Sequence, residues 1–172
     1  MRQRSSLVLA AAIIAVLAAD IGVLAATVGY RGGAVSAVVS RSSVTGGATT
    51  SEGFVRIPEA RLNIGVPDGQ QAILIITFSG TSHCGDADET TSAYCETSIL
   101  VDGQPIAAGT VRFDAATVTD GHFGYQTASF TVAAGPLAAG PHTVTVDYRV
   151  DEGEATFELR NWNLTVMRAR AA

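Results

Sequence analysis

The chain contains two cysteines, Cys84 and Cys95, which enclose a short polar segment. Two cysteines that bracket one loop of an exported chain are most simply explained by a disulfide. Closing a loop of about a dozen residues is expected to stabilise a fold by about 3 kcal/mol. The alternative is a catalytic thiol at Cys84 with His83 as its base, but adjacent residues of an extended chain point in opposite directions. The spacing therefore predicts a Cys84–Cys95 disulfide.

Three acidic residues of the same loop, Asp86, Asp88 and Glu89, are weak candidates for calcium ligands, because carboxylate oxygens suit this hard cation. The loop lacks the spaced ligand series and the closing glutamate of a complete calcium loop. A solvated acidic loop is the simpler interpretation. The three histidines of the chain are not spaced as zinc ligands. No cofactor is therefore expected beyond this weak calcium site.

A second group of residues that could bind a ligand lies near the C-terminus, where Arg160, Asn161 and Asn163 flank Trp162. An aromatic ring beside hydrogen-bonding side chains is suited to carbohydrate, and Tyr125 is a further candidate for stacking on a sugar. Aromatic residues of alternating segments are nevertheless more often core residues. The sequence leaves both interpretations of Trp162 open.

The sequence lacks the short motifs of nucleophile elbows, zinc proteases, phosphate loops and dinucleotide sites. Paired carboxylates can hydrolyse glycosides, but nothing selects one pair among the acidic residues. The formal net charge is −5, and from residue 51 onward seven arginines and fifteen acidic residues give −8. An acidic domain repels phosphate backbones, so nucleic acid is not an expected partner.

The N-terminal segment has the pattern of an export signal. Met1–Ser6 is a short basic leader, and a mainly apolar run follows over residues 7–28. A cleaved signal peptide needs about 7–15 apolar residues, whereas a membrane anchor needs about 20. Residues 1–30 are therefore predicted to be an apolar helix that acts as signal peptide or signal anchor, with the domain outside the cell in both cases. Residues 31–51, rich in Gly, Ser and Thr, are predicted to be a flexible linker.

Residues 52–168 show the period-two alternation of half-buried β-strands, most clearly over His142–Val150. Gly, Pro and Asp turns separate the segments. Ala155–Leu159 and Trp162–Val166 are expected to follow as two strands that complete an antiparallel meander. The domain is therefore predicted to be an all-β antiparallel β-sandwich, of which the jelly roll is one form, with a short tail at 169–172.

The closing part of the chain, Leu137–Val146 with Phe157–Leu159 and Trp162–Val166, resembles the last strands of exported bacterial jelly-roll domains. Carbohydrate-binding modules are among these domains. The same strand and turn pattern is also similar to that of the trimeric C1q/TNF-like sandwiches. The resemblance implies a β-sandwich, and it matches no site residue of these families.

Together these patterns predict a non-enzymatic extracellular β-sandwich module with a binding or surface-structural role. Its expected partner is a cell-surface polysaccharide or protein, and residues 7–28 would anchor it to the membrane if the signal is not cleaved. One alternative is a carbohydrate-binding module that uses Trp162 and the polar residues beside it. The other is a hydrolase without a recognisable motif.

Overall fold

The structure of the chain is a computed structural model that describes residues 34–85, 93–116, 124–151 and 154–171. These residues belong to one structural unit, Gly32–Ala172. The predicted N-terminal helix lies outside them. Among the residues that are described, no helix has the length and apolar character needed to cross a membrane.

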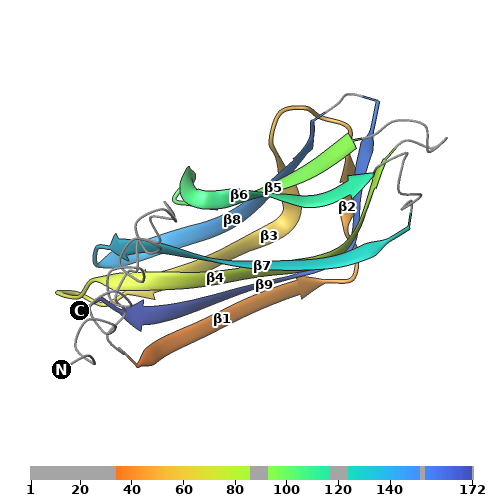
Figure 1. Ribbon diagram of the computed structural model, residues 1–172. Coiled ribbons are helices and arrows are strands. Elements are labelled where there is room, and N and C mark those ends of the chain that lie inside the picture. Colours follow the sequence, from red (N-terminus) through yellow and green to blue (C-terminus); the bar gives the residue numbers. More distant parts are fainter. Residues whose placement is uncertain (1–33, 86–92, 117–123, 152–153, 172) are drawn as a thin grey trace, which may run out of the picture. The chain divides into compact units, whose positions relative to one another are not determined.

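The described residues form nine β-strands in two antiparallel sheets that pack face to face (Figure 1). In the five-stranded sheet the order is β1-β9-β4-β7, and the short β2 also pairs with β9. In the four-stranded sheet the order is β3-β8-β5-β6. The strands are β1 Val35–Ser43, β2 Gly47–Thr49, β3 Val55–Val66, β4 Ala72–Gly85, β5 Ala93–Val101, β6 Gln104–Ala116, β7 Gln126–Leu137, β8 Gly140–Val150 and β9 Thr156–Arg170.

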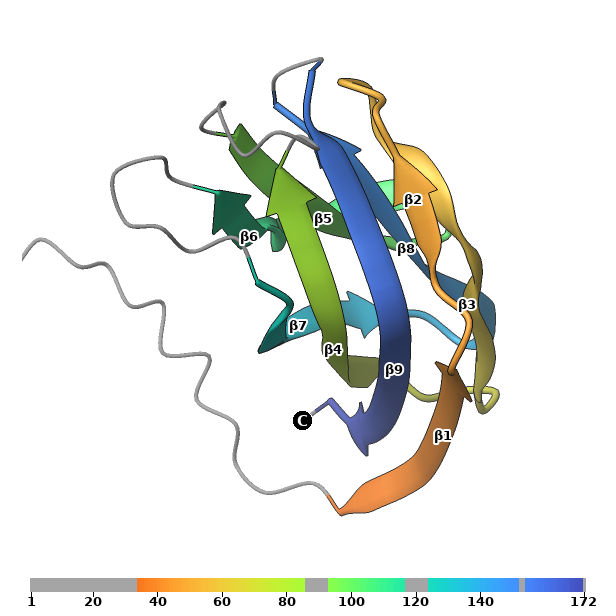
Figure 2. The same cartoon turned by 90° about the vertical axis from the view of Figure 1, so that its right-hand side faces the viewer.

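The chain passes back and forth between the sheets, so most paired strands are distant in sequence. Without β2, each sheet has four strands, and their order is that of a jelly roll. Figure 2 shows β4 and β9 in front, with β5 and β8 behind them. The predicted antiparallel β-sandwich is confirmed.

Alternate residues of the central strands form the core between the sheets. On β4, Leu74, Ile76 and Phe78 have no exposed surface, and the same holds for Val144 and Val146 on β8. Burial of each such side chain contributes roughly 1.5–3 kcal/mol. The residues between them point to the outer faces of the sheets, where side chains are available to ligands.

The segment predicted to be a flexible linker, residues 31–51, instead contains β1 and β2. Both pair with β9. Ala37 and Val39 pack against the core, whereas Val38 is 58% exposed. The valines of β1 suit a strand, but the partner strand lies at the far end of the chain. No local pattern therefore reveals the pairing.

Strand β9 corrects two further predictions. It runs continuously over Thr156–Arg170, where the sequence predicts two strands and a tail at 169–172. At the predicted break the chain forms a β-bulge, in which Arg160 has no partner on β4 although Leu159 and Asn161 do. Strands β8 and β9 lie in different sheets, so they do not form the predicted meander.

Candidate functional site

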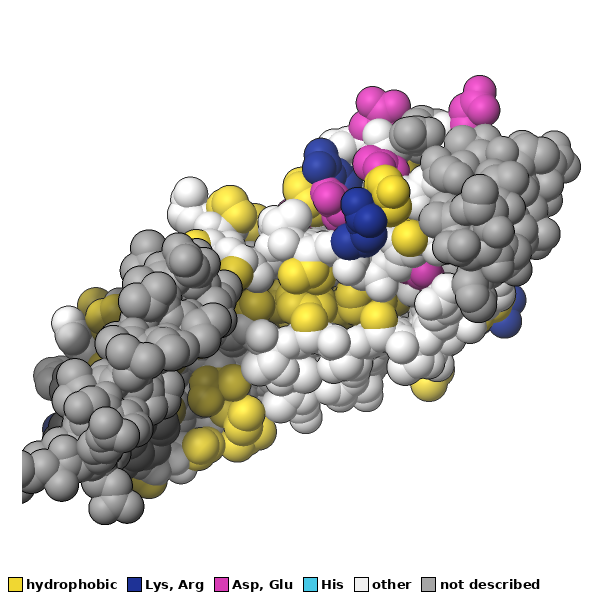
Figure 3. All heavy atoms as spheres, viewed as in Figure 1, with side chains coloured by type: hydrophobic (Ala, Val, Ile, Leu, Met, Phe, Trp, Pro, Cys, Tyr) yellow, Lys and Arg dark blue, Asp and Glu magenta, His cyan; other side chains and the backbone are white. Residues whose placement is uncertain are grey.

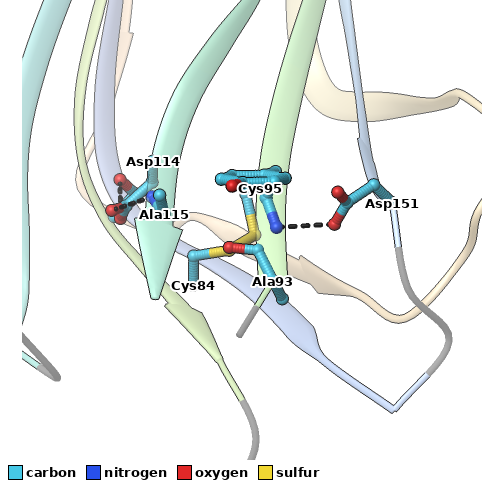
Figure 4. The surroundings of a disulfide bond; sticks show 8 residues. Cys84, Ala93, Cys95, Asp114, Ala115 and Asp151 are labelled. Carbon is cyan, nitrogen blue, oxygen red and sulfur yellow. Dashed lines mark hydrogen bonds between the residues drawn. A yellow bond between two sulfur atoms is a disulfide. The ribbon is translucent and has the colours of Figure 1, made fainter. Parts of the chain in front are cut away.

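The predicted disulfide between Cys84 and Cys95 is present (Figure 4). The two Cα atoms are 5.8 Å apart, and both side chains are buried. Cys84 belongs to β4 and Cys95 to β5, so the bond ties the two sheets together. A bridged cysteine has no thiolate to act as nucleophile, which rules out the catalytic-thiol alternative.

Trp162 lies in the core. Its side chain is 3% exposed, and its ring stacks on that of Phe78 with the centroids 6.4 Å apart. It shares the inner face of β9 with Leu164 and Val166. Trp162 contributes to the lining of a surface hollow, but too little of the residue is exposed for a sugar to stack on its ring. The alternation that predicts a core residue is therefore correct, and the hypothesis of a ligand stacked on Trp162 does not fit the structure.

Two other predicted ligand-binding residues, Tyr125 and Arg160, come together at the surface. The guanidinium carbon of Arg160 lies 3.5 Å from the centre of the Tyr125 ring, which is a cation–π contact. Glu158 joins them, with Oε1 3.5 Å from Nε of Arg160. The hydrogen bond from Tyr125, followed by Arg160, lowers the pKa of Glu158. The ring of His83 packs against Tyr125 at 5.5 Å. This aromatic–charged cluster borders the outer face of the five-stranded sheet.

Short uncharged polar side chains cover much of that outer face. Strand pairing places them opposite one another, and the hydroxyls of Thr77 and Thr131 are hydrogen-bonded at 2.8 Å. Because paired strands are about 4.8 Å apart, each row presents polar groups at about this interval. The polar rows consist of Ser40, Thr165, Thr77 and Thr131, then Ser42, Asn163, Ser79 and Ser129, and then Asn161, Thr81 and Thr127.

The sequence-based candidates include Asn161 and Asn163 but no hydroxyl of the polar rows. A signal exists, because Ser or Thr occupies every second position over 77–81 on β4 and over 127–131 on β7. This spacing places all six hydroxyls on one face of the sheet. Their contact across β4 and β7 depends on register between distant segments, which the sequence does not show.

A shallow hollow of about 290 Å³ lies in this face, and Val44, Gly80 and Trp162 line it together with Ser, Thr and Asn residues of the neighbouring strands. Ser42, Thr127 and Asn163 contribute to it from three different strands. Asn161 also lines it, and its Oδ1 accepts a hydrogen bond from the backbone N–H of Thr81 at 3.1 Å, which holds the bulge in place. Figure 3 shows a mainly white surface around the middle of β7, beside a band of hydrophobic side chains between β7 and β6.

The pair Asp102 and His142 is arranged as two members of a catalytic triad would be. Nδ1 of His142 donates to Oδ2 of Asp102 at 2.7 Å, and Nε2 donates to the carbonyl oxygen of Ala138 at 2.8 Å. A general base needs a ring nitrogen that faces a nucleophile. Both nitrogens of His142 are engaged, so this pair fastens the β5–β6 turn to β8 instead.

Asp114 is a buried carboxylate near the disulfide (Figure 4). Burial raises its pKa. Ser82 Oγ donates to Oδ2 of Asp114 at 2.6 Å, but Ser82 has no exposed surface. A hydroxyl without access to solvent cannot attack a substrate. The Ser82–Asp114 pair therefore belongs to the packing of the sandwich.

The calcium candidates Asp86, Asp88 and Glu89 lie outside the described residues. Within the part of the chain that the structure describes, no three His, Cys, Asp or Glu side chains gather so that they could hold a metal ion. The described residues thus offer two kinds of surface for binding, which are uncharged polar rows and charged clusters.

The sequence matches no protein-family model and no curated protein. The dimeric latent PorU from Porphyromonas gingivalis is a similar solved structure, with a TM-score of 0.42 and 7% identity, covering 80% of this chain. The match spans 14% of the length of PorU. A family 35 carbohydrate-binding module from an environmental isolate is also similar, with a TM-score of 0.37, 18% identity, and coverage of 80% of this chain and 94% of that one. A carbohydrate-binding module is thus among the structures that this chain resembles, and neither likeness assigns a site residue.

Proposed function

We propose that this chain is an exported, non-enzymatic binding module, and that the polar rows of its five-stranded sheet bind a neutral carbohydrate. The observation that carries this proposal is the outer face itself. Hydroxyl and amide side chains from β1, β9, β4 and β7 stand in register there. The hollow of about 290 Å³ lies among them.

The chemistry of the polar rows suits sugar hydroxyls, which both donate and accept hydrogen bonds. Ser and Thr hydroxyls and Asn amides do the same. Binding a neutral sugar here would require no desolvation of a charge in the rows, which is a large cost at charged surfaces. The side chains are also short, so little rotamer entropy is lost when they are immobilised. Tyr125, which is 37% exposed, offers ring surface at the border of the face.

Export is supported by the basic leader and the apolar run over residues 7–28. The Cys84–Cys95 disulfide supports it independently, because such bonds persist in oxidising compartments. A tagged full-length chain is expected to be cleaved by protease added to intact cells. Protection of the domain until the cells are lysed would contradict export.

The binding proposal is tested by co-sedimentation of the full chain with insoluble cellulose, chitin and isolated bacterial cell walls, with and without added calcium. We expect saturable binding to at least one neutral polysaccharide. The double substitution Thr127→Ala and Asn163→Ala should weaken it about tenfold, since two hydrogen bonds are lost. Thr110→Ala, an exposed threonine of the four-stranded sheet, is the matched control and should bind normally.

Absence of binding to all three materials would contradict the proposal, as would equal binding by the double variant and wild type. The proposal that the module is not an enzyme is tested separately in the same incubation. Release of soluble sugar during incubation with any of the three materials would identify a hydrolase instead.

A further inference from the structure

An irregular segment of β3 places two arginines side by side on the outer face of the four-stranded sheet. Arg56 pairs with Asp147 and Arg61 with Thr145, so the four β3 residues between the arginines lie opposite the single β8 residue Val146. The extra residues include Pro58 and Glu59, and Glu59 has a φ of 60°. A left-handed non-glycine residue is energetically costly and is enriched at functional sites.

Asp147 and Thr145 are two residues apart on β8, and Val146 between them has no exposed surface. Both therefore face outward, as do the arginines opposite them. A hollow of about 260 Å³ lies at this point, lined by Arg56, Arg61, Asp102, Gly103, Thr143 and Thr145.

One lining hydroxyl lacks the partner that a buried polar group requires. Thr145 is 3% exposed, and its Oγ1 has no hydrogen-bond partner among the described residues. Leaving such a group unsatisfied costs about 1–3 kcal/mol. The neighbouring hydroxyl of Thr143 is already committed, because it donates to Oδ1 of Asn63 at 3.0 Å. Thr145 lines the hollow, and its buried hydroxyl retains a donor that no described residue uses.

The charges around the hollow leave one cation uncompensated. Arg56 forms an ion pair with Asp147. The oxygens of Asp102 accept hydrogen bonds from His142 and from the backbone N–H of Thr143. Arg61 has no carboxylate within ion-pair distance among the described residues. The hollow thus combines a planar guanidinium donor with an unused hydroxyl donor.

We propose that Arg61 and Thr145 bind a carboxylate group of an acidic ligand in this hollow, on the sheet opposite to the polar rows. The guanidinium fork matches the two oxygens of a carboxylate. A monoanion is favoured over a phosphate dianion, because Asp102 lines the same hollow and repulsion grows with ligand charge. This inference is independent of the proposed carbohydrate function.

The test is a titration of the ¹⁵N-labelled full chain with sodium acetate and with galacturonate, with backbone amides of Gly103 and Thr145 as reporters. Sodium chloride at matched ionic strength and neutral galactose are the ligand controls. We expect saturable shifts with the two carboxylates only. Arg61→Gln should weaken the affinity about tenfold, because a charge-assisted hydrogen bond is lost.

Two further variants separate binding from folding. Thr145→Val keeps the shape of the side chain and removes the unsatisfied hydroxyl, so it should weaken carboxylate binding without lowering the melting temperature. Arg170→Gln, an exposed arginine of the five-stranded sheet, should bind carboxylates as wild type does. Shifts equal to those from chloride, or unchanged affinity in Arg61→Gln, would overturn the proposal. Phosphate binding as tight as acetate binding would overturn the preference for a carboxylate.

Discussion

Trp162 and Asn163 are neighbours in the sequence but face opposite sides of β9. Trp162 packs in the core, whereas Asn163 belongs to the polar rows of the outer face. Period-two alternation predicts that adjacent residues of a strand have such different environments. It does not show which face of a strand meets the second sheet, and for this reason the sequence leaves both roles of Trp162 open.

Trp162→Ala should lower the free energy of unfolding by about 3–5 kcal/mol, because it leaves a cavity in the core. Trp162→Phe should cost less than Trp162→Ala, since the phenyl ring keeps part of the packing and leaves a smaller cavity. The phenylalanine variant also removes the indole Nε1 of Trp162, which is buried and has no hydrogen-bond partner among the described residues. Urea denaturation of the three proteins measures both values. An alanine variant as stable as wild type would place the indole outside the core.

His142 should make stability depend on pH. Hydrogen bonds to Asp102 and to the Ala138 carbonyl raise the pKa of His142 above its ordinary value of about 6.5. The folded state thus holds this proton more tightly than the unfolded state. The stabilisation is complete below about pH 6.5 and is lost as the pH rises through the folded-state pKa.

Asp102 has the opposite dependence. The hydrogen bond from His142, with a further bond from the Thr143 N–H, lowers the pKa of Asp102. Its stabilisation is present above about pH 3.9 and is lost as the pH falls through the folded-state pKa. Melting temperatures between pH 5 and 8 should therefore fall more steeply in wild type than in His142→Gln. Parallel curves for the two proteins would contradict a role for this pair.

At the scale of the element, the sequence predicts the strands that alternate clearly but not β1 or the continuity of β9. β1 is a strand because β9 provides its partner, and this long-range hydrogen bonding is invisible in a local pattern. The predicted break in β9 falls at Arg160 and Asn161, where the chain forms a bulge. A bulge interrupts the alternation as a turn does, so the two cannot be distinguished by periodicity alone.

The disulfide can be predicted from the sequence because it requires only two cysteines in a chain that is exported to an oxidising compartment. It does not require knowledge of the register between distant strands. Replacing both Cys84 and Cys95 by alanine should destabilise the domain by about 3 kcal/mol, because the unfolded chain regains the entropy of an open loop. The core strands remain, so the circular dichroism spectrum should stay that of a β-protein. Identical melting curves for the native chain with and without reductant would show that the bond contributes nothing.

Strands β1 and β2 pair with the same edge of β9, and the connection between them passes close to the β9 backbone at Gly46. A Cβ at this position would lie 1.2 Å from the carbonyl oxygen of Leu159. Gly46→Ala should therefore displace β2 from β9 and cost about 3 kcal/mol or more, at the upper end for overpacking. Gly53→Ala is the control, because its Cβ would meet only Ser51 Oγ, at 3.7 Å. Equal hydrogen exchange at the Ala48 amide in wild type and Gly46→Ala would contradict the close approach.

At the scale of the whole domain, the two sheets present different outer surfaces. The five-stranded sheet carries the polar rows, whereas the four-stranded sheet carries ion pairs such as Arg149 with Glu96 at 2.6 Å. The alternation of each strand predicts one inner and one outer face. The composition of a whole face depends on the order and register of strands from distant segments, and the structure is needed to see it.

The most direct test of the central claim is a titration of the ¹⁵N-labelled full chain with soluble neutral oligosaccharides, cellohexaose and chitohexaose. The polar rows predict that one of them shifts the amides around Ser79, Thr127 and Asn163 in a saturable way, and that Tyr125 at the border responds with them. Shifts confined to the four-stranded sheet, or no saturable shift with either sugar, would contradict a carbohydrate-binding face on the five-stranded sheet.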